Sequence, residues 1–236
     1  MVFECYARLR RSAPRNFRMN EKNHSGSAGS AVSQSVLAND GSDAPERDPI
    51  ELFLAWYGDA EKAGAPFADA FALATADASG RPSVRFVLFK GFVDGTLRFV
   101  TNFESRKARD LAGNSRAALA FFWPATGRQV RMEGSVERAR DADSDRYFEQ
   151  RDRLTQLGAW ASAQSRPIAN RAELEAQLIE REREFEGAPV PRPPHWGMLA
   201  FTPTVVELWT SGEHRLHDRF RYERDGVRWR VERLAP

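Results

Sequence analysis

Residues 211–222 carry basic side chains at alternate positions. As a β-strand, this run would place Arg215, His217, Arg219 and Arg221 on one face. Like charges repel along a strand face, so such a row is stable only where solvent or an anionic group meets it. The pattern alone is as typical of a solvated basic face as of a site for an anionic ligand.

A second basic group stands at a predicted helix start. Ser105 is a typical N-cap residue, and Arg106 and Lys107 would then occupy the first turn. Two cations at the positive end of the helix dipole cost free energy unless an anion is present. Free N–H groups, a hydroxyl and two cations together predict a phosphate site, although an exposed basic turn shows the same pattern.

Two further cations, Arg85 and Lys90, flank the apolar residues 86–89. Their positions differ in parity, so a regular strand would point them to opposite faces. Both can reach one ligand only if the strand ends or bulges before Lys90, next to Gly91. The alternative is that Lys90 extends to solvent from the strand end.

Hydrogen-bond donors recur at helical spacing further along the chain. Tyr147, Arg151 and Thr155 would form one stripe if a single helix spans them, and each can donate to a phosphate oxygen. A solvated helix face is the commoner explanation of such a trio. Gln164 and Ser165 add an amide and a hydroxyl after an apolar patch, which is a weak signal by itself.

The elements that must position these residues are mostly strands. Alternating apolar residues predict strands at 71–75, 83–89, 96–101, 117–123, 129–138, 204–209, 219–224 and 227–234. Hairpins are predicted at Asp94-Gly95 and Asp225-Gly226. Helices are predicted from Asp48-Pro49 onward and at 105–113, 141–151 and 170–186. The pattern favours a mainly β (α+β) fold, a Greek-key or split barrel with peripheral helices.

Composition limits the class of protein. The chain has 236 residues, of which 42% are hydrophobic, enough for one domain. Its net charge is +2, but residues 1–18 hold five arginines and one glutamate, so the remainder is slightly acidic and nucleic-acid binding is disfavoured. The single cysteine, Cys5, allows no disulfide framework and favours a reducing, cytoplasmic setting. Because no apolar run of about 18 residues occurs, a membrane span is not expected.

The amino-terminal part differs in composition from the rest. Residues 1–44 are rich in Arg, Ser, Gly and Asn, and we expect them to form a disordered extension. Residues 45–236 are expected to form one domain. The Arg-rich start is faintly similar to a transit peptide, and Met19 is an alternative start of the working protein.

Several motifs, in this order, resemble the pyridoxine/pyridoxamine 5'-phosphate oxidase family. The resemblance runs from about Asp48 to Pro236. It rests on Arg85-Phe-Val-Leu-Phe-Lys90, Thr101-Asn102 with Ser105-Arg106-Lys107, Arg128-Gln129-Val130, Gly158-Ala159-Trp160 with Gln164-Ser165, and the run from Gly212 to Arg219.

The resemblance implies an FMN-binding split β-barrel that forms a homodimer, with FMN in clefts at the subunit interface. Implied FMN contacts are Arg85, Phe86, Val87, Leu88, Phe89, Lys90, Val100, Thr101, Arg106, Lys107, Gln129, Gln164, Ser165, Trp209 and Arg219. Implied contacts to a phosphorylated B6 substrate are Lys90, Tyr147, Arg151, Thr155, Arg215, Leu216 and His217. No metal is implied.

The implied reaction is oxidation of pyridoxamine 5'-phosphate and pyridoxine 5'-phosphate to pyridoxal 5'-phosphate, with O2 as acceptor and H2O2 as by-product. Arg215 and His217 are the implied catalytic residues, lying over the pyridine ring as orienting and electrostatic groups. The flavin carries the redox step, and the protein supplies placement and charge.

The chain departs from the family pattern in three places. Thr155 stands where the family usually has Ser, and Val100 stands where it usually has Tyr. The Arg-rich, Tyr-containing segment that many members use as a lid has no counterpart in residues 20–46. Two other functions stay open: a related flavin oxidase of another ring substrate, such as a dihydrophenazine precursor, and a flavin- or pyridoxal phosphate-binding protein with little turnover. Retention of Lys90, Tyr147, Arg151 and the full run from Arg215 to Arg219 favours the B6 substrate.

Overall fold

The protein is described by a computed structural model, which covers residues 47–236. The predicted extension of residues 1–44 therefore lies outside the described residues. The helices are α2 (Pro49–Lys62), α3 (Arg106–Gly113), α4 (Asp141–Glu149), α5 (Arg153–Ala161) and α6 (Arg171–Glu184). The strands are β1 (Ala70–Ala76), β2 (Pro82–Leu88), β3 (Phe92–Val93), β4 (Thr96–Asn102), β5 (Arg116–Trp123), β6 (Arg128–Arg138), β7 (Trp196–Thr210), β8 (Asp218–Asp225) and β9 (Arg228–Arg233). Short 3-10 turns are η1 (Pro124–Thr126) and η2 (Glu213–Arg215).

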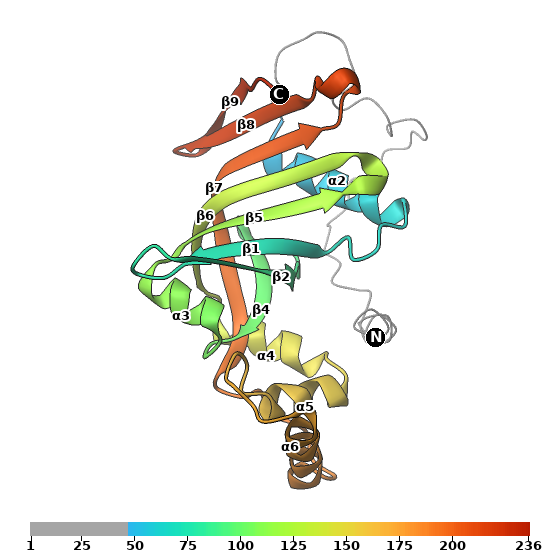
Figure 1. Cartoon of the computed structure of the whole chain (residues 1–236), viewed down its shortest axis with the longest axis vertical. Helices are drawn as coiled ribbons and strands as arrows, with labels where there is room; N and C mark the ends of the chain where they lie inside the picture. Colours follow the sequence, from blue (N-terminus) through green and yellow to red (C-terminus); the bar gives the residue numbers. More distant parts are fainter. Residues whose placement is uncertain (1–46) are drawn as a thin grey trace.

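All nine strands of residues 47–236 belong to one curved antiparallel sheet (Figure 1). Its order is β2-β1-β5-β6-β7-β4-β3, and β8 and β9 extend it from β7. Figure 1 shows β8 and β9 at one end of the molecule and helices α4 to α6 at the other. The prediction of a mainly β fold with peripheral helices is confirmed. Among the described helices, none is both long and apolar enough to cross a membrane.

Strand β7 organises the sheet because it has two successive partners along one edge. Its first half pairs with β4, from Trp196 to Phe201, and its second half pairs with β8, from Val205 to Thr210. Along the other edge it pairs with β6, with a register shift at Gly134. A Cβ at that position would lie 2.1 Å from the carbonyl oxygen of Thr202, so only glycine fits the bulge.

Strand β7 is also the main departure from the predicted elements. The prediction was a strand at 204–209, whereas the structure extends it back to Trp196. Residues 196–201 are all buried, because this half of the strand is covered on both faces. A strand buried on both sides has a continuous apolar sequence and lacks the period-two signal.

The main core lies between the sheet and α2. Helix α2 begins as predicted, with Asp48 Oδ1 accepting from the backbone N–H of Ile50 at 2.7 Å. Its buried face packs Phe53 against Phe121 and Trp123 of β5. A second, smaller cluster of Phe148, Leu157, Val190 and Trp196 joins α4 and α5 to the start of β7. The first cluster holds α2 on the sheet, and the second holds α4 and α5 at the start of β7.

The predicted hairpin at Asp94-Gly95 is confirmed. Both residues have positive φ, 50° and 75°, as a type I′ turn requires. The turn brings Val93 opposite Thr96 and so sets the register of β3 on β4. It thereby places the loop of Lys90 beside β4.

Candidate anion-binding site

A cavity of about 1440 Å³ lies between strands β2 to β4, the start of α3 and helices α4 and α5. This volume exceeds the roughly 300–1000 Å³ of a typical pocket for one small ligand. Eight arginines and lysines line it, against four aspartates and glutamates. The cavity therefore fits anionic ligands and is large enough for more than one.

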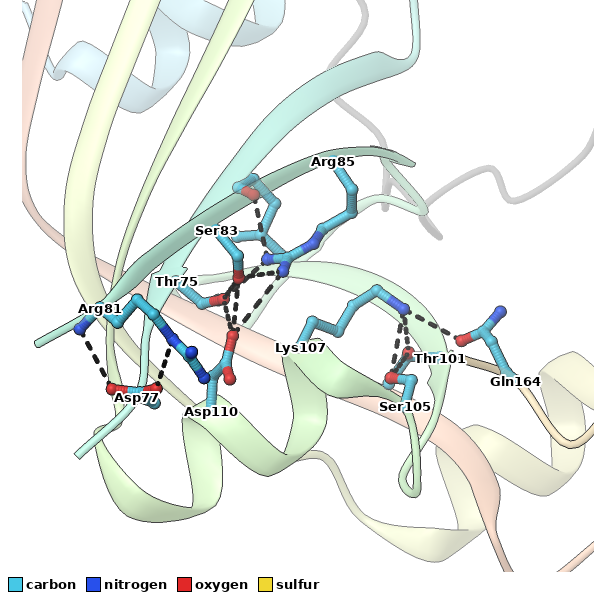
Figure 2. A network of polar contacts seen from close by, with 11 residues as sticks. Thr75, Asp77, Arg81, Ser83, Arg85, Thr101, Ser105, Lys107, Asp110 and Gln164 are labelled. Carbon is cyan, nitrogen blue, oxygen red and sulfur yellow. Dashed lines mark hydrogen bonds and ion pairs between the residues drawn. The ribbon is translucent and has the colours of Figure 1, made fainter. Parts of the chain in front are cut away.

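Lys107, in the first turn of α3, is the most perturbed cation of the cavity. Its Nζ donates to the hydroxyls of Thr101 at 2.9 Å and Ser105 at 3.2 Å, and to Oε1 of Gln164 at 3.0 Å (Figure 2). Burial, with a smaller contribution from the charge of Arg85, lowers the pKa of Lys107 to about 8. A buried ammonium held by these three neutral acceptors is stabilised by an incoming anion.

Ser105 occupies the N-cap position of α3 as predicted, but its hydroxyl makes no cap hydrogen bond. The hydroxyl instead lies within hydrogen-bonding distance of Thr101 and Lys107. No acidic residue stands in the first turn, and Arg106 there is exposed and lines the cavity. The start of α3 thus presents N–H groups and two cations to the cavity, as the sequence predicts.

Arg85 is held at this end of the cavity by a polar network (Figure 2). It donates to Thr75 Oγ1 at 2.7 Å and lies 3.7 Å from Asp110. Burial raises the pKa of Asp110, but hydrogen bonds from Thr75 and Ser83 outweigh it and hold that pKa below the ordinary value. Burial lowers the pKa of Arg85, although the charge of Asp110 opposes this. The carboxylate orients Arg85 and stays ionised.

Lys90 lies at the other end of β2 and also lines the cavity. Strand β2 ends at Leu88, and Gly91 has a φ of +110°. The chain leaves the strand geometry before Lys90, which is how Arg85 and Lys90 line one cavity despite their different parity. The Lys90 ammonium is 3.6 Å from Asp69.

No single helix spans Tyr147, Arg151 and Thr155, so the three residues do not form the helical stripe considered from their spacing. Helix α4 ends at Glu149, and a new helix, α5, begins after its N-cap Asp152. The Asp152 carboxylate accepts from the backbone N–H of Thr155 at 2.9 Å and also from the Thr155 hydroxyl. Arg151 lies in the break between the helices.

The three residues nevertheless line the same cavity. Tyr147 stacks on Trp196, and Arg151 lies over that ring at 4.6 Å from its centroid. Burial raises the pKa of Tyr147 and lowers that of Arg151. One guanidinium nitrogen of Arg151 is buried without a hydrogen-bond partner among the described residues. The part of the cavity around Arg151 therefore also presents a cation with an unsatisfied hydrogen-bond donor.

Most of the remaining predicted cofactor contacts also line the cavity. Phe86, Val87, Leu88, Val100, Gln164 and Ser165 all line the cavity, and Ser165 has a φ of +69°. Phe89 lines it too, while its ring packs edge-on against Phe53 and Tyr57 of α2. The structure brings all these residues together.

Arg98 is a cavity residue that the sequence reasoning missed. It lies in the middle of β4, is 8% exposed, and lines the cavity. Its Nε is buried and has no hydrogen-bond partner within residues 47–236. The signal in the sequence is a lone charge inside the strand run 96–101, which was predicted as a strand without a role.

The basic run at the C-terminus does not form one continuous strand. Strand β8 begins only at Asp218, and residues 213–215 form η2, with positive φ at His214 and Arg215. Only Arg219 and Arg221 belong to the strand face that was predicted for all four residues. His217 packs against Trp209, with ring centroids 4.7 Å apart, and its Nδ1 accepts from the backbone N–H of Gly212.

Carboxylates of the chain itself meet much of this charge. Glu207, 5% exposed, accepts from Arg219 at 3.0 Å and from Arg131. Arg221 pairs with Glu223 and Glu232. Arg219 and Arg221 therefore do not require an external anion, contrary to what their spacing in the sequence suggests.

Six of the predicted site residues do not line the cavity of the described chain: Gln129, Trp209, Arg215, Leu216, His217 and Arg219. The register places Gln129 opposite Trp209 and Trp209 opposite Arg219, so these three share a face of the sheet. The same sheet face carries exposed apolar residues, with Val84 69%, Phe86 77% and Phe122 58% exposed. An apolar face of this kind is typical of a subunit interface.

Comparison with known protein families accounts for both regions. The family model "Pyridoxamine 5'-phosphate oxidase" matches residues 59–182, and "Pyridoxine 5'-phosphate oxidase C-terminal dimerisation region" matches residues 196–236. The pyridoxine/pyridoxamine 5'-phosphate oxidase of Rubrobacter xylanophilus is 50% identical over 200 residues, covering 85% of this chain and 91% of that protein. The enzyme of the same name from Anaeromyxobacter dehalogenans is 51% identical over 189 residues, covering 80% and 96%.

Solved structures agree. PhzG from Burkholderia lata, determined with tetrahydrophenazine-1-carboxylic acid, superposes with a TM-score of 0.79 at 33% identity, over 86% of this chain and 100% of that one. A pyridoxamine 5'-phosphate oxidase-related, FMN-binding protein from Nostoc punctiforme has the same fold, with a TM-score of 0.64 at 22% identity, over 83% and 100%. The matched segments together include most of the cavity lining and the C-terminal strands, and the chain belongs to the pyridoxamine 5'-phosphate oxidase family.

Proposed function

We propose that the protein is an FMN-dependent oxidase that converts pyridoxamine 5'-phosphate and pyridoxine 5'-phosphate to pyridoxal 5'-phosphate, with O2 as acceptor and H2O2 as by-product. The observation that carries this proposal is a single cavity with unmet cations at two ends, one around Lys107 and one around Arg151. Two phosphorylated ligands, the cofactor and the substrate, match two such ends.

The Lys107 end fits the phosphate of FMN. It combines a helix start without a side-chain cap, a buried ammonium and the guanidiniums of Arg85 and Arg106. The Thr101 hydroxyl and the Gln164 amide add two more groups that can donate a hydrogen bond to an anion. Because these groups are held by one another, the site is preorganised and loses little side-chain entropy on binding.

The Arg151 end fits the phosphate of the substrate. Tyr147 and Arg151 pack on Trp196, which fixes their direction, and the Thr155 hydroxyl lies at the start of α5. Lys90 adds a fourth donor from the loop after β2. These four side chains can contact the oxygens of one phosphate group from several sides. The ring of the substrate then extends toward the middle of the cavity.

The flavin, when bound, supplies the acceptor for the two electrons that leave the substrate carbon. The residues of the chain bind and orient the two ligands and exclude water from between them. We assign Arg215 and His217 to the substrate ring as orienting and electrostatic groups. The protein acts as a homodimer, and we propose that these two residues reach the cavity of the partner subunit, together with Gln129, Trp209 and Arg219. Support comes from their location outside their own cavity and beside an exposed apolar sheet face.

Mixed dimers test this assignment. Arg151→Ala and Arg215→Ala homodimers are expected to be inactive, because each lacks one member of every site. If the two residues serve one site from different subunits, unfolding and refolding an equal mixture restores about a quarter of wild-type activity, since half of the dimers carry one intact site of two. No recovery, with mixed dimers verified by mass spectrometry, would place both residues in one subunit.

Absorbance under anaerobic conditions tests the function itself. The FMN-loaded protein should lose its flavin absorbance when pyridoxamine 5'-phosphate is added and regain it in air. Arg106→Ala is expected to weaken FMN retention, whereas Arg215→Ala should retain FMN and lose turnover. Equal loss of FMN in both variants would contradict this division of roles, and a flavin that never bleaches would contradict the oxidase.

A second function has one specific observation in its favour. The PhzG structure was determined with a phenazine carboxylic acid, and this chain shares 33% identity with it. A phenazine precursor carries no phosphate, so it leaves the donors at the Arg151 end without a dianionic partner. Comparison of tetrahydrophenazine-1-carboxylic acid with pyridoxamine 5'-phosphate as substrates separates the two functions. We also propose a cytoplasmic location, supported by the single cysteine of the sequence.

A further inference from the structure

Arg98 is the most deeply buried arginine of the cavity lining, with 8% of its surface exposed. It has no carboxylate within ion-pair distance in the described part of the chain, and its Nε has no hydrogen-bond partner there. Arg85, by contrast, is held by Asp110 at 3.7 Å. Burying a charge without such a partner costs free energy unless an anion arrives.

The position of Arg98 within the sheet decides which ligand it meets. In β4, Arg98 and Val100 share one face, while Thr101, which accepts from Lys107, lies on the other. The backbone of Arg98 accepts from the N–H of Lys90 and donates to the carbonyl of Gly91, both at 2.8 Å. Arg98 is therefore bound to the loop of Lys90 and lies on the opposite strand face from the Lys107 end.

We propose that Arg98 is a further substrate-binding residue, whose guanidinium takes part in holding the phosphate of the substrate beside Lys90 and Arg151. The inference rests on the proposed function for the identity of the substrate. It explains why a charge is tolerated in the interior of a strand that is mostly buried. The same substitution that weakens phosphate binding should then relieve a cost in the ligand-free protein.

The test compares Arg98→Met with wild type as FMN-loaded dimers in phosphate-free buffer. Without phosphate, the variant should melt about 2–4 °C higher, because an unpaired buried charge has been replaced by an apolar chain of similar length. Inorganic phosphate should raise the melting temperature of wild type more than that of the variant. The KM for pyridoxamine 5'-phosphate should rise about tenfold, the loss expected for one charge-assisted hydrogen bond.

Arg183→Met is the matched control, since Arg183 is exposed on α6 and does not line the cavity. It removes the same charge and should change neither the phosphate response nor KM. Arg98→Lys keeps the charge but not the planar fork, and it should recover part of the phosphate response.

Three outcomes would overturn the proposal. A lower melting temperature with unchanged KM would show that Arg98 only supports the Lys90 loop. Release of FMN from Arg98→Met would assign the guanidinium to the cofactor. A phosphate response equal to that of wild type would remove Arg98 from the phosphate site. The melting experiments do not require turnover, so a wild-type protein that fails to oxidise pyridoxamine 5'-phosphate would contradict the proposed function without deciding the role of Arg98.

Discussion

Arg219 and Arg221 of the C-terminal strands and three of the cavity cations, Lys107, Arg98 and Arg151, differ in whether a carboxylate among the described residues pairs with them. Arg219 and Arg131 share the buried carboxylate of Glu207, and Arg221 lies between Glu223 and Glu232. In the cavity, by contrast, Lys107 contacts neutral oxygens, and Arg98 and Arg151 each keep a buried nitrogen without a partner in the described chain.

The difference separates stability from binding. A cation paired within the chain contributes to the folded state and has less charge left for a ligand. A buried cation without a carboxylate lowers stability and keeps its charge for binding. The density of arginines in a sequence therefore does not locate an anion site, whereas unmet charge in the structure does.

Arg151→Gln should give the largest effect of the cavity substitutions. Loss of its charge at the substrate phosphate is expected to lower kcat/KM for pyridoxamine 5'-phosphate about a hundredfold while FMN stays bound. Arg153→Gln is the control, because Arg153 lies outside the cavity lining and binds the carbonyls of residues 185 and 188. Similar losses of kcat/KM in both variants would mean that the position of Arg151 in the cavity does not account for the effect.

Lys107→Met should weaken FMN binding about tenfold at pH 7, the loss of one charge-assisted contact. The pKa of Lys107 is about 8 without an anion, and a bound phosphate raises it, so FMN binding takes up a proton. Wild-type FMN affinity should therefore fall as pH rises above 8, by at most about tenfold per pH unit, and the variant should lose this dependence. Fluorescence titrations of FMN between pH 6.5 and 9.5 measure both.

The same depressed pKa predicts how stability changes with pH in the FMN-free protein. Between about 8 and the ordinary value of 10.5, the unfolded chain binds the Lys107 proton more tightly than the folded one. Stability from this residue should therefore rise with pH across that window. A flat difference between wild type and Lys107→Met over the same window, in urea unfolding, would be inconsistent with a buried ammonium.

Glu207→Gln would make the C-terminal region resemble the cavity. It leaves Arg219 and the half-exposed Arg131 without their carboxylate, so the free energy of unfolding should fall by about 1–3 kcal/mol. Burial raises the pKa of Glu207, but hydrogen bonds from both arginines outweigh it, so the stabilisation is present above the ordinary 4.5 and lost as pH falls below it. Urea unfolding at pH 7 and pH 4 measures this, and an equal difference at both would contradict it.

The smallest effect is expected for Glu232→Gln, which breaks the exposed pair with Arg221. Both side chains are about one-third or more exposed, so unfolding free energy should change by less than about 0.5 kcal/mol. A loss as large as that of Glu207→Gln would mean that burial does not distinguish the two pairs.

Much of the fold follows from local sequence signals. Asp48-Pro49 marks the start of α2, and Asp94-Gly95 marks the hairpin that sets β3 on β4. Such signals act over a few residues and do not depend on tertiary contacts. The first half of β7 and the break at Asp152 were missed for different reasons. The former is buried on both faces, and the latter depends on whether an Asp caps a new helix or continues the old one.

Cavity residues that belong to a recognisable motif could be predicted from the sequence. Residues whose role depends on burial could not. The motif of residues 85–90 led to Arg85 and Lys90, and the structure places both in the cavity. Arg98 belongs to no quoted motif, and only its burial separates it from a surface arginine. The division of the predicted site into a cavity group and a C-terminal group could not be read from spacing, because it depends on which sheet face each strand presents.

The number of residues in β7 sets the distance and the relative facing of its two halves. Its first half lines the cavity through Trp196 and Met198, and its second half carries Trp209, about 40 Å further along an extended strand. If the two halves serve the two active sites of the dimer, one inserted residue would turn every following side chain to the opposite face and shift one site against the other. In that arrangement an insertion in the turns at either end of β7 leaves both sites in place, whereas an insertion between Trp196 and Trp209 displaces one of them.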